Sequence, residues 1–453
     1  MKNILKNTKR STFLIIATIF LSSLLILPNT LSTSTAPQLN DSVFHLDEQK
    51  IGILIINYGE PTTFTQDTFS DFKAYMTHML DVGMLPSFLK NIDKGTILTD
   101  TNNGQWTPFF QRNLVNAWGE TTMPVALYAK GNEKMHTSPH YFLPFFGPGF
   151  GEADVYEQAT LTAYHSWRNM NNYSPYKDHT MPQINNVIDQ LELEYGDRIS
   201  CTSAFGFEHG DVSTETNELL NQNIDALIVT PQMVVDSDFE GTLHWYKDVY
   251  ETIDEATIDI PVVIGEQIGS QPSFVESIVR KVKEELNQLS SDARVSLFLS
   301  NHGFPPVKIG SFDAGSDSYH DNADYVFQLV KKAIIENMST EKLVEIKQIY
   351  AEFAEGDNDP ENIVFSPMEA LNTLPSNCNY VIDIPYGFIG ETTDTLNALR
   401  DAFGVEGWDE NYETIFTYEE KVTVKITSCY FHNHLREQAL YESINNELNR
   451  FFP

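Results

Sequence analysis

The chain has 453 residues, 41% of them hydrophobic, which is enough to bury cores in two or three domains. Its net charge of −34 argues against a nucleic-acid partner, because phosphate binding needs a basic surface, and against adhesion to anionic lipid. The three cysteines are Cys201, Cys378 and Cys429. They form no Cys-x-x-Cys pair, which argues against a disulfide scaffold, a zinc ribbon or an iron–sulfur cluster and leaves one disulfide open.

The N-terminal segment has the pattern of a targeting element. Basic residues precede an apolar run over 13–27, which fits a secretory signal and approaches the length of a membrane span. We therefore expect residues 1–30 to be a signal peptide or a membrane anchor and residues 31–48 to be a linker. Because the positive flank stays inside, the body should be extracytoplasmic, either secreted or membrane-anchored through this segment, with no other membrane contact.

From residue 51 onward, short apolar runs alternate with amphipathic segments. Strands are predicted over 51–57, 226–230, 261–264, 295–300 and 380–384. Helices are predicted over 181–194, 213–222, 273–288, 321–337, 392–403 and 436–451. This alternation predicts an α/β fold with two similar Rossmann-like lobes, parallel sheets flanked by helices and a cleft between the lobes.

The same pattern sets the expected domain boundaries. The first lobe should cover 49–265 and the second 266–453, with the final helix packing back on the first lobe. Residues 80–180 interrupt the pattern with aromatic, glycine-rich and proline-rich pieces, which predicts an insertion in the first lobe. It is either a lip for a flat apolar ligand or a subdomain whose aromatic residues form its own core.

Two predicted strand ends repeat one motif. The residues after strand 51–56 read Asn-Tyr-Gly-Glu-Pro (57–61), and those after strand 295–300 read Asn-His-Gly-Phe-Pro (301–305). Glycine and proline turn the chain at the carboxyl end of a strand, where open α/β sheets bind their ligands. The motif therefore predicts that Tyr58 and His302 face one cleft from two lobes. His302 would accept a proton or ligate a metal ion there, and the alternative is a histidine that only caps a turn.

A third strand end carries two acids. The segment 384–394 reads Ile-Pro-Tyr-Gly-Phe-Ile-Gly-Glu-Thr-Thr-Asp, which places Glu391 and Asp394 three residues apart near a predicted helix start. At that spacing they should share one face. They are either caps of the helix or a pair of oxygen ligands and proton acceptors opposite His302.

These motifs resemble one known family. Ser-Asn-His-Gly-Phe-Pro (300–305), followed by Gly-Ser-Asp-Ser-Tyr (315–319), resembles the ferrochelatase signature, and 386–396 resembles the acidic segment of that family. The motifs come in the family order over most of 50–62 and 200–450. The chain thus resembles the ferrochelatase family, which are class II chelatases with a chelatase-like fold.

The resemblance implies a lyase, a ferrochelatase-type metal chelatase of haem biosynthesis. Such an enzyme inserts a divalent metal ion, most often Fe²⁺, into a porphyrin or a related tetrapyrrole. The metal ion is then a substrate, and no other cofactor is required. The resemblance implies that the catalytic residues are His302, Asp394 and Glu391 and that the metal ligands are His302 and Asp394. It implies macrocycle contacts for Tyr58, His209, Phe304 and Tyr386.

Two alternatives stay open at this point. One is an exported, non-catalytic protein that binds a tetrapyrrole or a metal ion. The other is a cobalt or nickel chelatase that acts on a different macrocycle. The sequence specifies neither the metal, the side groups of the ring nor the oligomeric state.

Overall fold

The computed structural model describes residues 49–63, 107–115, 121–129, 170, 173–208, 210–304, 308–309, 312–313, 317–339, 341–351 and 365–452. The predicted signal peptide or anchor, the linker and most of the 80–180 insertion lie outside these residues. The described residues all belong to one compact unit. None of their helices is long and apolar enough to cross a membrane.

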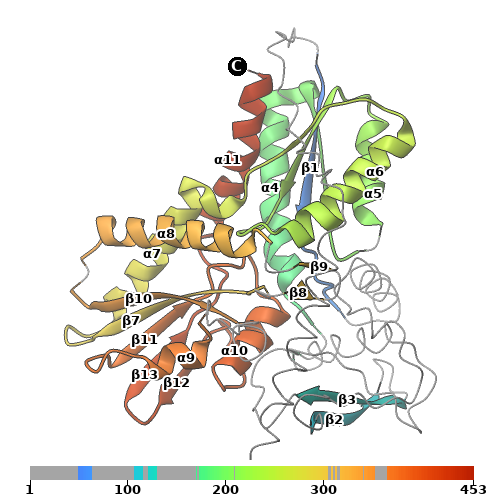
Figure 1. Cartoon of the computed structure of the whole chain (residues 1–453). Coiled ribbons are helices and arrows are strands. Elements are labelled where there is room, and N and C mark those ends of the chain that lie inside the picture. The colour runs from blue at the N-terminus through green and yellow to red at the C-terminus, as the bar shows by residue number, and fades with distance from the viewer. Residues whose placement is uncertain are drawn as a thin grey trace, which may run out of the picture. The chain divides into compact units, whose positions relative to one another are not determined.

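The first lobe is a sheet of four parallel strands in the order β4-β1-β5-β6. Its strand β1 (Ile51–Asn57) is buried along its whole length, as expected of an apolar run inside a parallel sheet. Alternate side chains point to opposite faces, so Ile53 and Ile55 pack on the side of α4, and Leu54 and Ile56 on the side of α5 and α6 (Figure 1). The other elements are β4 (Ile199–Phe205), β5 (Ala226–Pro231), β6 (Val262–Ile264), α4 (Tyr176–Tyr195), α5 (Asp211–Leu220), α6 (Tyr246–Ala256) and a π-helical segment, Asp238–Trp245.

The second lobe has five strands in the order β10-β7-β11-β13-β12. All pairings are parallel except that of β12 with β13. Strand β7 (Val295–Asn301) takes the place that β1 has in the first lobe, with Leu297 and Leu299 on the side of α7 and α8 and Phe298 on the other side. The other elements are α7 (Pro272–Gln288), α8 (Tyr319–Asn337), β10 (Leu343–Tyr350), α9 (Pro367–Asn372), β11 (Tyr380–Ile384), a π-helical segment (Asp394–Ala398), α10 (Leu399–Ala402), β12 (Thr414–Tyr418), β13 (Val422–Ile426) and α11 (Asn433–Phe451).

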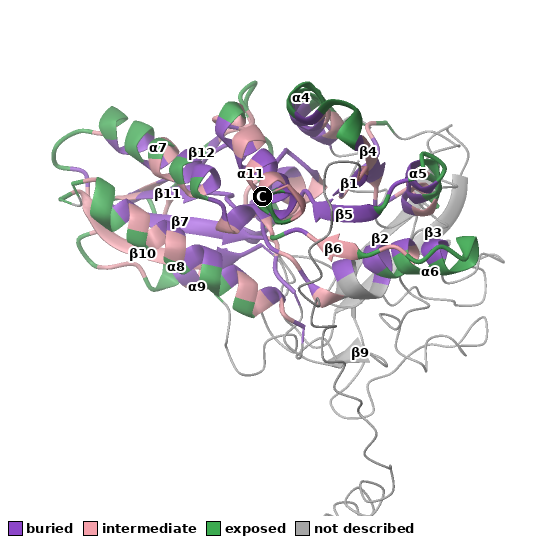
Figure 2. Ribbon diagram, turned by 90° about the horizontal axis from the view of Figure 1, so that it is seen from above, coloured by how far each residue is buried: buried purple, intermediate pink, exposed green. Residues whose placement is uncertain are grey.

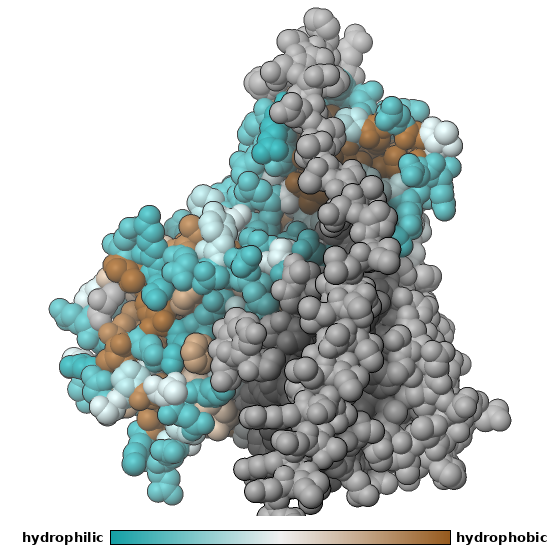
Figure 3. Space-filling model, in the orientation of Figure 1, coloured by the Kyte–Doolittle hydropathy of each residue, from teal (hydrophilic) through white to brown (hydrophobic). Residues whose placement is uncertain are grey.

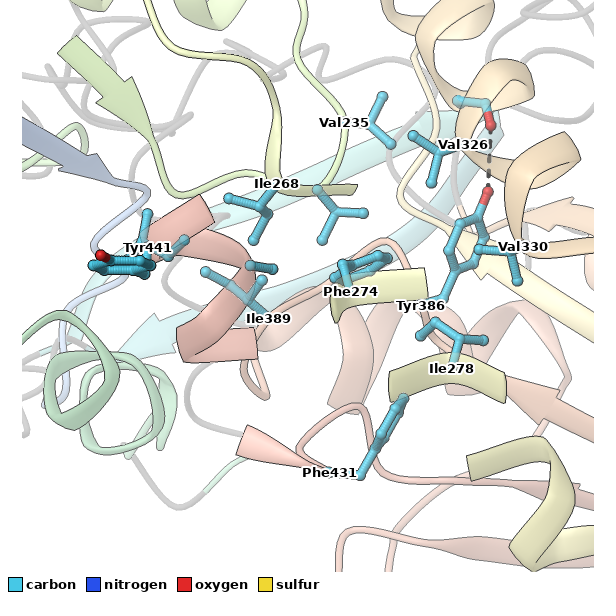
Figure 4. Close-up of a cluster of buried hydrophobic side chains, with 14 of the residues drawn as sticks. Val235, Ile268, Phe274, Ile278, Val326, Val330, Tyr386, Ile389, Phe431 and Tyr441 are labelled. Carbon is cyan, nitrogen blue, oxygen red and sulfur yellow. Dashed lines mark hydrogen bonds between the residues drawn. The ribbon is translucent and has the colours of Figure 1, made fainter. Parts of the chain in front are cut away.

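One hydrophobic core joins the two lobes. The same cluster of buried side chains contains Ile53 of β1 and Leu297 of β7, and Figure 4 shows Phe274, Tyr386 and Tyr441 within it. The last helix, α11, packs against both α4 and α7. Figure 2 shows that the central strands β5, β7 and β11 are mostly buried, that β6 and β10 are largely half-buried, and that the outer faces of the helices are exposed. The shared core therefore holds the carboxyl ends of the two sheets in a fixed relation.

The predicted fold class is confirmed, because both sheets are parallel at their centres and are flanked by helices. The predicted strands 51–57 and 380–384 coincide with β1 and β11. The domain boundary near residue 265 stays a prediction. Two antiparallel strand pairs form separate two-stranded sheets: β2 (Thr107–Val115) with β3 (Thr121–Ala129), and β8 (Lys308–Ile309) with β9 (Phe312–Asp313).

The described surface in Figure 3 is mostly hydrophilic, with small hydrophobic areas between. All three cysteines are free, so the disulfide that the composition leaves open is not formed. The fold is therefore stabilised by its buried core and by polar contacts, several of which lie at the carboxyl ends of the strands.

Candidate active site

The repeated strand-end motif builds the same backbone turn in both lobes. Gly59 and Gly303 adopt φ angles of 77° and 110°, a region that favours glycine. The preceding asparagines are fully buried, and each donates from Nδ2 to a residue just after the neighbouring strand. Asn57 bonds Gln232 Oε1 at 2.5 Å, and Asn301 bonds the Tyr386 hydroxyl at 2.9 Å. Tyr58 and His302, at the second position of the two motifs, thus occupy equivalent positions.

The His302 imidazole is held in one orientation. Its Nδ1 lies 2.6 Å from the carbonyl oxygen of Gly303. A carbonyl oxygen only accepts, so Nδ1 carries the hydrogen and Nε2 presents a lone pair in the neutral ring. Nε2 lies 3.9 Å from Oδ2 of Asp394, and the His302 side chain is 34% exposed. The arrangement is that of a base with solvent access and a nearby carboxylate.

Asp394 begins the π-helical segment that follows β11. The Thr392 hydroxyl accepts from the backbone N–H groups of Asp394 and Thr395, at 3.0 and 3.2 Å, and so fixes the first turn. Burial raises the pKa of the Asp394 carboxyl, and the nearby His302 lowers it in part. The carboxyl therefore holds a proton more readily than an exposed aspartate. The predicted pairing of His302 with an acid from this segment is present in the structure.

Glu60, in the turn after β1, is a buried acid beside the candidate site to which the strand-end motif assigns no role. Its carboxyl accepts from the Ser174 hydroxyl at 2.5 Å and from the Thr393 hydroxyl at 2.6 Å. Burial, and then the charge of Asp394, raise the pKa of Glu60 to about 8. The signal that points to it is a lone acid in a turn that follows a fully apolar strand.

Glu391 has different partners from Asp394. It is fully buried, and its carboxylate accepts from the Ser428 hydroxyl, the Cys429 N–H and the Thr395 hydroxyl, at 2.6, 2.7 and 2.6 Å. The expected common face of the two acids is wrong, because residue 391 precedes the helix and its side chain turns into the protein. These bonds suit a carboxylate that holds the segments 391–395 and 428–429 together. A catalytic part for Glu391 stays a prediction.

The residues that are predicted to contact the macrocycle differ in how deeply they are buried. Tyr58 is half-buried, and its ring lies 4.1 Å from that of Phe207. Phe304 is 8% exposed and packs 6.0 Å from the ring of Tyr319. Tyr386 is fully buried in the core, where its hydroxyl contacts the Ala323 carbonyl oxygen at 3.4 Å (Figure 4). Tyr386 therefore serves the core, whereas Tyr58 keeps an accessible surface; His209 lies outside the described residues.

Among the described residues, no group of three or more His, Cys, Asp or Glu side chains could hold a metal ion. The His302–Asp394 pair offers two candidate ligands.

Comparison with known proteins finds one matching family model and several similar solved structures. The ferrochelatase family model matches residues 155–355. Among solved structures, the chain is similar to SirB from Bacillus subtilis with Fe³⁺, at 9% identity and a TM-score of 0.39, covering 89% of this chain and 99% of that one. It is also similar to the sirohydrochlorin chelatase SirB from Bacillus subtilis subspecies spizizenii in complex with cobalt, at 11% identity and a TM-score of 0.35, covering 60% and 92%.

A periplasmic ribose ABC transporter from Conexibacter woesei is similar at 12% identity and a TM-score of 0.25, covering 60% of this chain and 81% of that one. No curated protein matches the chain. The ferrochelatase family model matches residues 155–355, which include His302, and this match bears out the resemblance predicted from the motifs.

Proposed function

We propose that this protein inserts Fe²⁺ into a porphyrin or a related tetrapyrrole, as a ferrochelatase-type lyase of haem biosynthesis. The family match supports metal chelation in general. The observation that carries the proposal is the His302–Asp394 pair, with Nε2 of the imidazole 3.9 Å from the carboxylate. Both metal and ring are substrates in this scheme.

The reaction needs a base, because the macrocycle must lose two pyrrole protons when a divalent metal ion takes their place. The lone pair of His302 Nε2 accepts a proton, and the imidazolium that forms is stabilised by the Asp394 carboxylate beside it. His302 is 34% exposed, so it can pass the proton on to water and accept the next one. Two protons leave for each metal ion that enters, and the charges balance.

The first lobe supplies a surface for the ring. Tyr58 stands at the position equivalent to His302, and its ring is supported by Phe207 and by Tyr176, whose centroids lie 4.1 and 5.9 Å away. An aromatic face packs well on a planar macrocycle. The net charge of −34 supports the cation side of the reaction, since a negative field raises the local concentration of divalent ions.

The proposed location is extracytoplasmic. The basic flank and the apolar run over 13–27 support it, as a cleaved signal or as an anchor. The location is separable from the proposed chemistry.

The test is a metal screen with purified full-length protein. Protoporphyrin and sirohydrochlorin are each mixed under anaerobic conditions with Fe²⁺, Co²⁺ or Ni²⁺, and metal insertion is followed by absorbance. The proposal predicts several turnovers per protein with Fe²⁺ and the porphyrin. A spectral change that stops at one equivalent would identify a binding protein. Turnover with only Co²⁺ or Ni²⁺, on the other ring, would identify a different chelatase.

A further inference from the structure

Glu60 joins three segments that are far apart in the chain. Its carboxyl accepts from the hydroxyl of Ser174, 114 residues away, at 2.5 Å. It accepts from the hydroxyl and the backbone N–H of Thr393, 333 residues away, at 2.6 and 3.1 Å. Glu60 is only 2% exposed, so these bonds are shielded from water.

Each of the three segments carries a part of the candidate site. The turn that contains Glu60 also carries Tyr58. Ser174 leads into α4, and the ring of Tyr176 at its start lies 5.9 Å from that of Tyr58. Thr393 directly precedes Asp394, which faces His302. The Glu60 carboxyl thus ties the aromatic wall of the first lobe to the acid of the second lobe.

The equivalent residue of the second lobe does not do this. Phe304 packs on Tyr319 and on the shared core, with no carboxyl to bond across the site. The acid at this place in the motif is specific to the first lobe. Glu60 also holds a proton near neutral pH, because its pKa is about 8, so a glutamine has nearly the same shape and charge.

We propose that Glu60 is a positioning residue, which sets the separation between Tyr58 and the His302–Asp394 pair. This separation in turn determines the position in which the macrocycle binds. The inference rests on the proposed function. An error of about 1 Å in the position of reacting groups can reduce a rate about 100-fold. Glu60→Asp shortens the side chain by one methylene and should produce such an error, whereas Glu60→Gln keeps the length.

The experiment compares kcat and KM for metal insertion in Glu60→Asp and Glu60→Gln with the wild type. We expect kcat to fall at least 10-fold in Glu60→Asp and to stay within about 3-fold in Glu60→Gln. The matched control is Glu285→Asp, which shortens another buried carboxylate, bonded to Lys281 and Lys425 at 2.7 and 2.8 Å in the second lobe. Its kcat should be unchanged at a temperature where it is folded.

Two results would overturn the inference. A wild-type kcat in Glu60→Asp would show that the length of the side chain does not matter. An equal loss in Glu60→Gln and Glu60→Asp would show that the carboxyl transfers a proton instead. If Glu60→Asp does not fold, Thr393→Val decides, since it removes the hydroxyl that bonds Glu60 and should lower kcat several-fold.

The wild type separates this inference from the proposed function. Absence of turnover in the wild type refutes the proposed function alone. Hydrogen exchange of residues 57–62 and 392–396 then judges the positioning role. It should be faster in Glu60→Asp than in Glu60→Gln in both segments, and equal exchange in the two variants would contradict the inference.

Discussion

The turn after β1 and the turn after β7 share a backbone plan and differ at two positions. Asn-Tyr-Gly-Glu-Pro in the first lobe faces Asn-His-Gly-Phe-Pro in the second. The second position holds Tyr58 in one turn and His302 in the other, and the fourth holds Glu60 and Phe304. Each turn reaches residues 393–394: Glu60 bonds Thr393, and His302 lies beside Asp394. Under the proposed function, the two turns therefore present a positioning group, Glu60, from one lobe and a base, His302, from the other.

The largest effect should come from the base. His302→Ala removes Nε2 and should lower the insertion rate about 10²- to 10⁴-fold, the range for loss of a general base. Binding of the metal-free ring, followed by its fluorescence, should persist, because the Tyr58 wall is intact. An unchanged insertion rate would show that His302 is not the base. The turns after β1 and β7 would then have no demonstrated difference in function.

The next effect should come from Asp394→Asn, which keeps the shape of the side chain and removes its charge. The imidazolium of His302 then loses the negative charge of the carboxylate that lies 3.9 Å away. The insertion rate should fall about 10- to 100-fold, which corresponds to about 1.4–2.7 kcal/mol of lost transition-state stabilisation. Rates at saturating ring and metal measure it. A rate equal to the wild type would mean that His302 works without this acid.

Stability tests the shared backbone plan. Gly59 has a φ of 77°, and a Cβ there would lie 2.5 Å from Cβ of Phe205, so Gly59→Ala should lower the free energy of unfolding by about 2–4 kcal/mol. The control is Gly404→Ala, where φ is 70° but nothing lies within 4 Å of the added Cβ. It should cost about 1–2 kcal/mol, and urea unfolding measures both. Equal losses would show that the turn is not tightly packed.

A further effect should be on the pH dependence of stability. Burial and then Asp394 raise the pKa of Glu60 from 4.5 to about 8. Between these values the folded protein holds a proton that the unfolded chain has lost. The free energy of unfolding therefore falls as pH rises, by at most about 1.4 kcal/mol per pH unit.

Glu60→Gln removes this contribution, so its stability should decline less than that of the wild type from pH 5 to 8. Urea unfolding at several pH values measures the slope. Asp383, whose pKa burial also raises to about 8, keeps part of the slope in the variant. An identical slope in both proteins would contradict the buried, neutral state of Glu60.

Much of the fold follows from local patterns. Strands β1 and β11 lie at the predicted residues, because predominantly apolar runs indicate buried parallel strands. The patterns do not indicate β10, where Glu345, Lys347 and Gln348 interrupt the run. It is an edge strand with mostly half-buried residues, and an edge strand needs less apolar surface (Figure 2).

The candidate site is predictable only in part. The strand-end motif points to His302 and Tyr58, since turns at strand ends are local features. The contact of Glu60 with Thr393 spans 333 residues and has no local signature. The spacing of apolar residues does not distinguish a π-helical from an α-helical turn. The sequence therefore predicts residues 394–398 as part of an ordinary helix, whereas in the structure they are π-helical. This difference helps to give Glu391 and Asp394 unlike partners.

Tyr58 and His302 occupy equivalent positions in the two turns, and we expect Tyr58 to bind the ring and His302 to act as the base. Saturation curves for Fe²⁺ insertion into porphyrin, measured side by side for Tyr58→Leu and His302→Ala, test it most directly. We expect Tyr58→Leu to raise the KM for the ring about 2- to 10-fold with little change in kcat, as for the loss of one aromatic contact. His302→Ala should lower kcat with little change in KM. The opposite assignment, or the same change in both variants, would contradict the account.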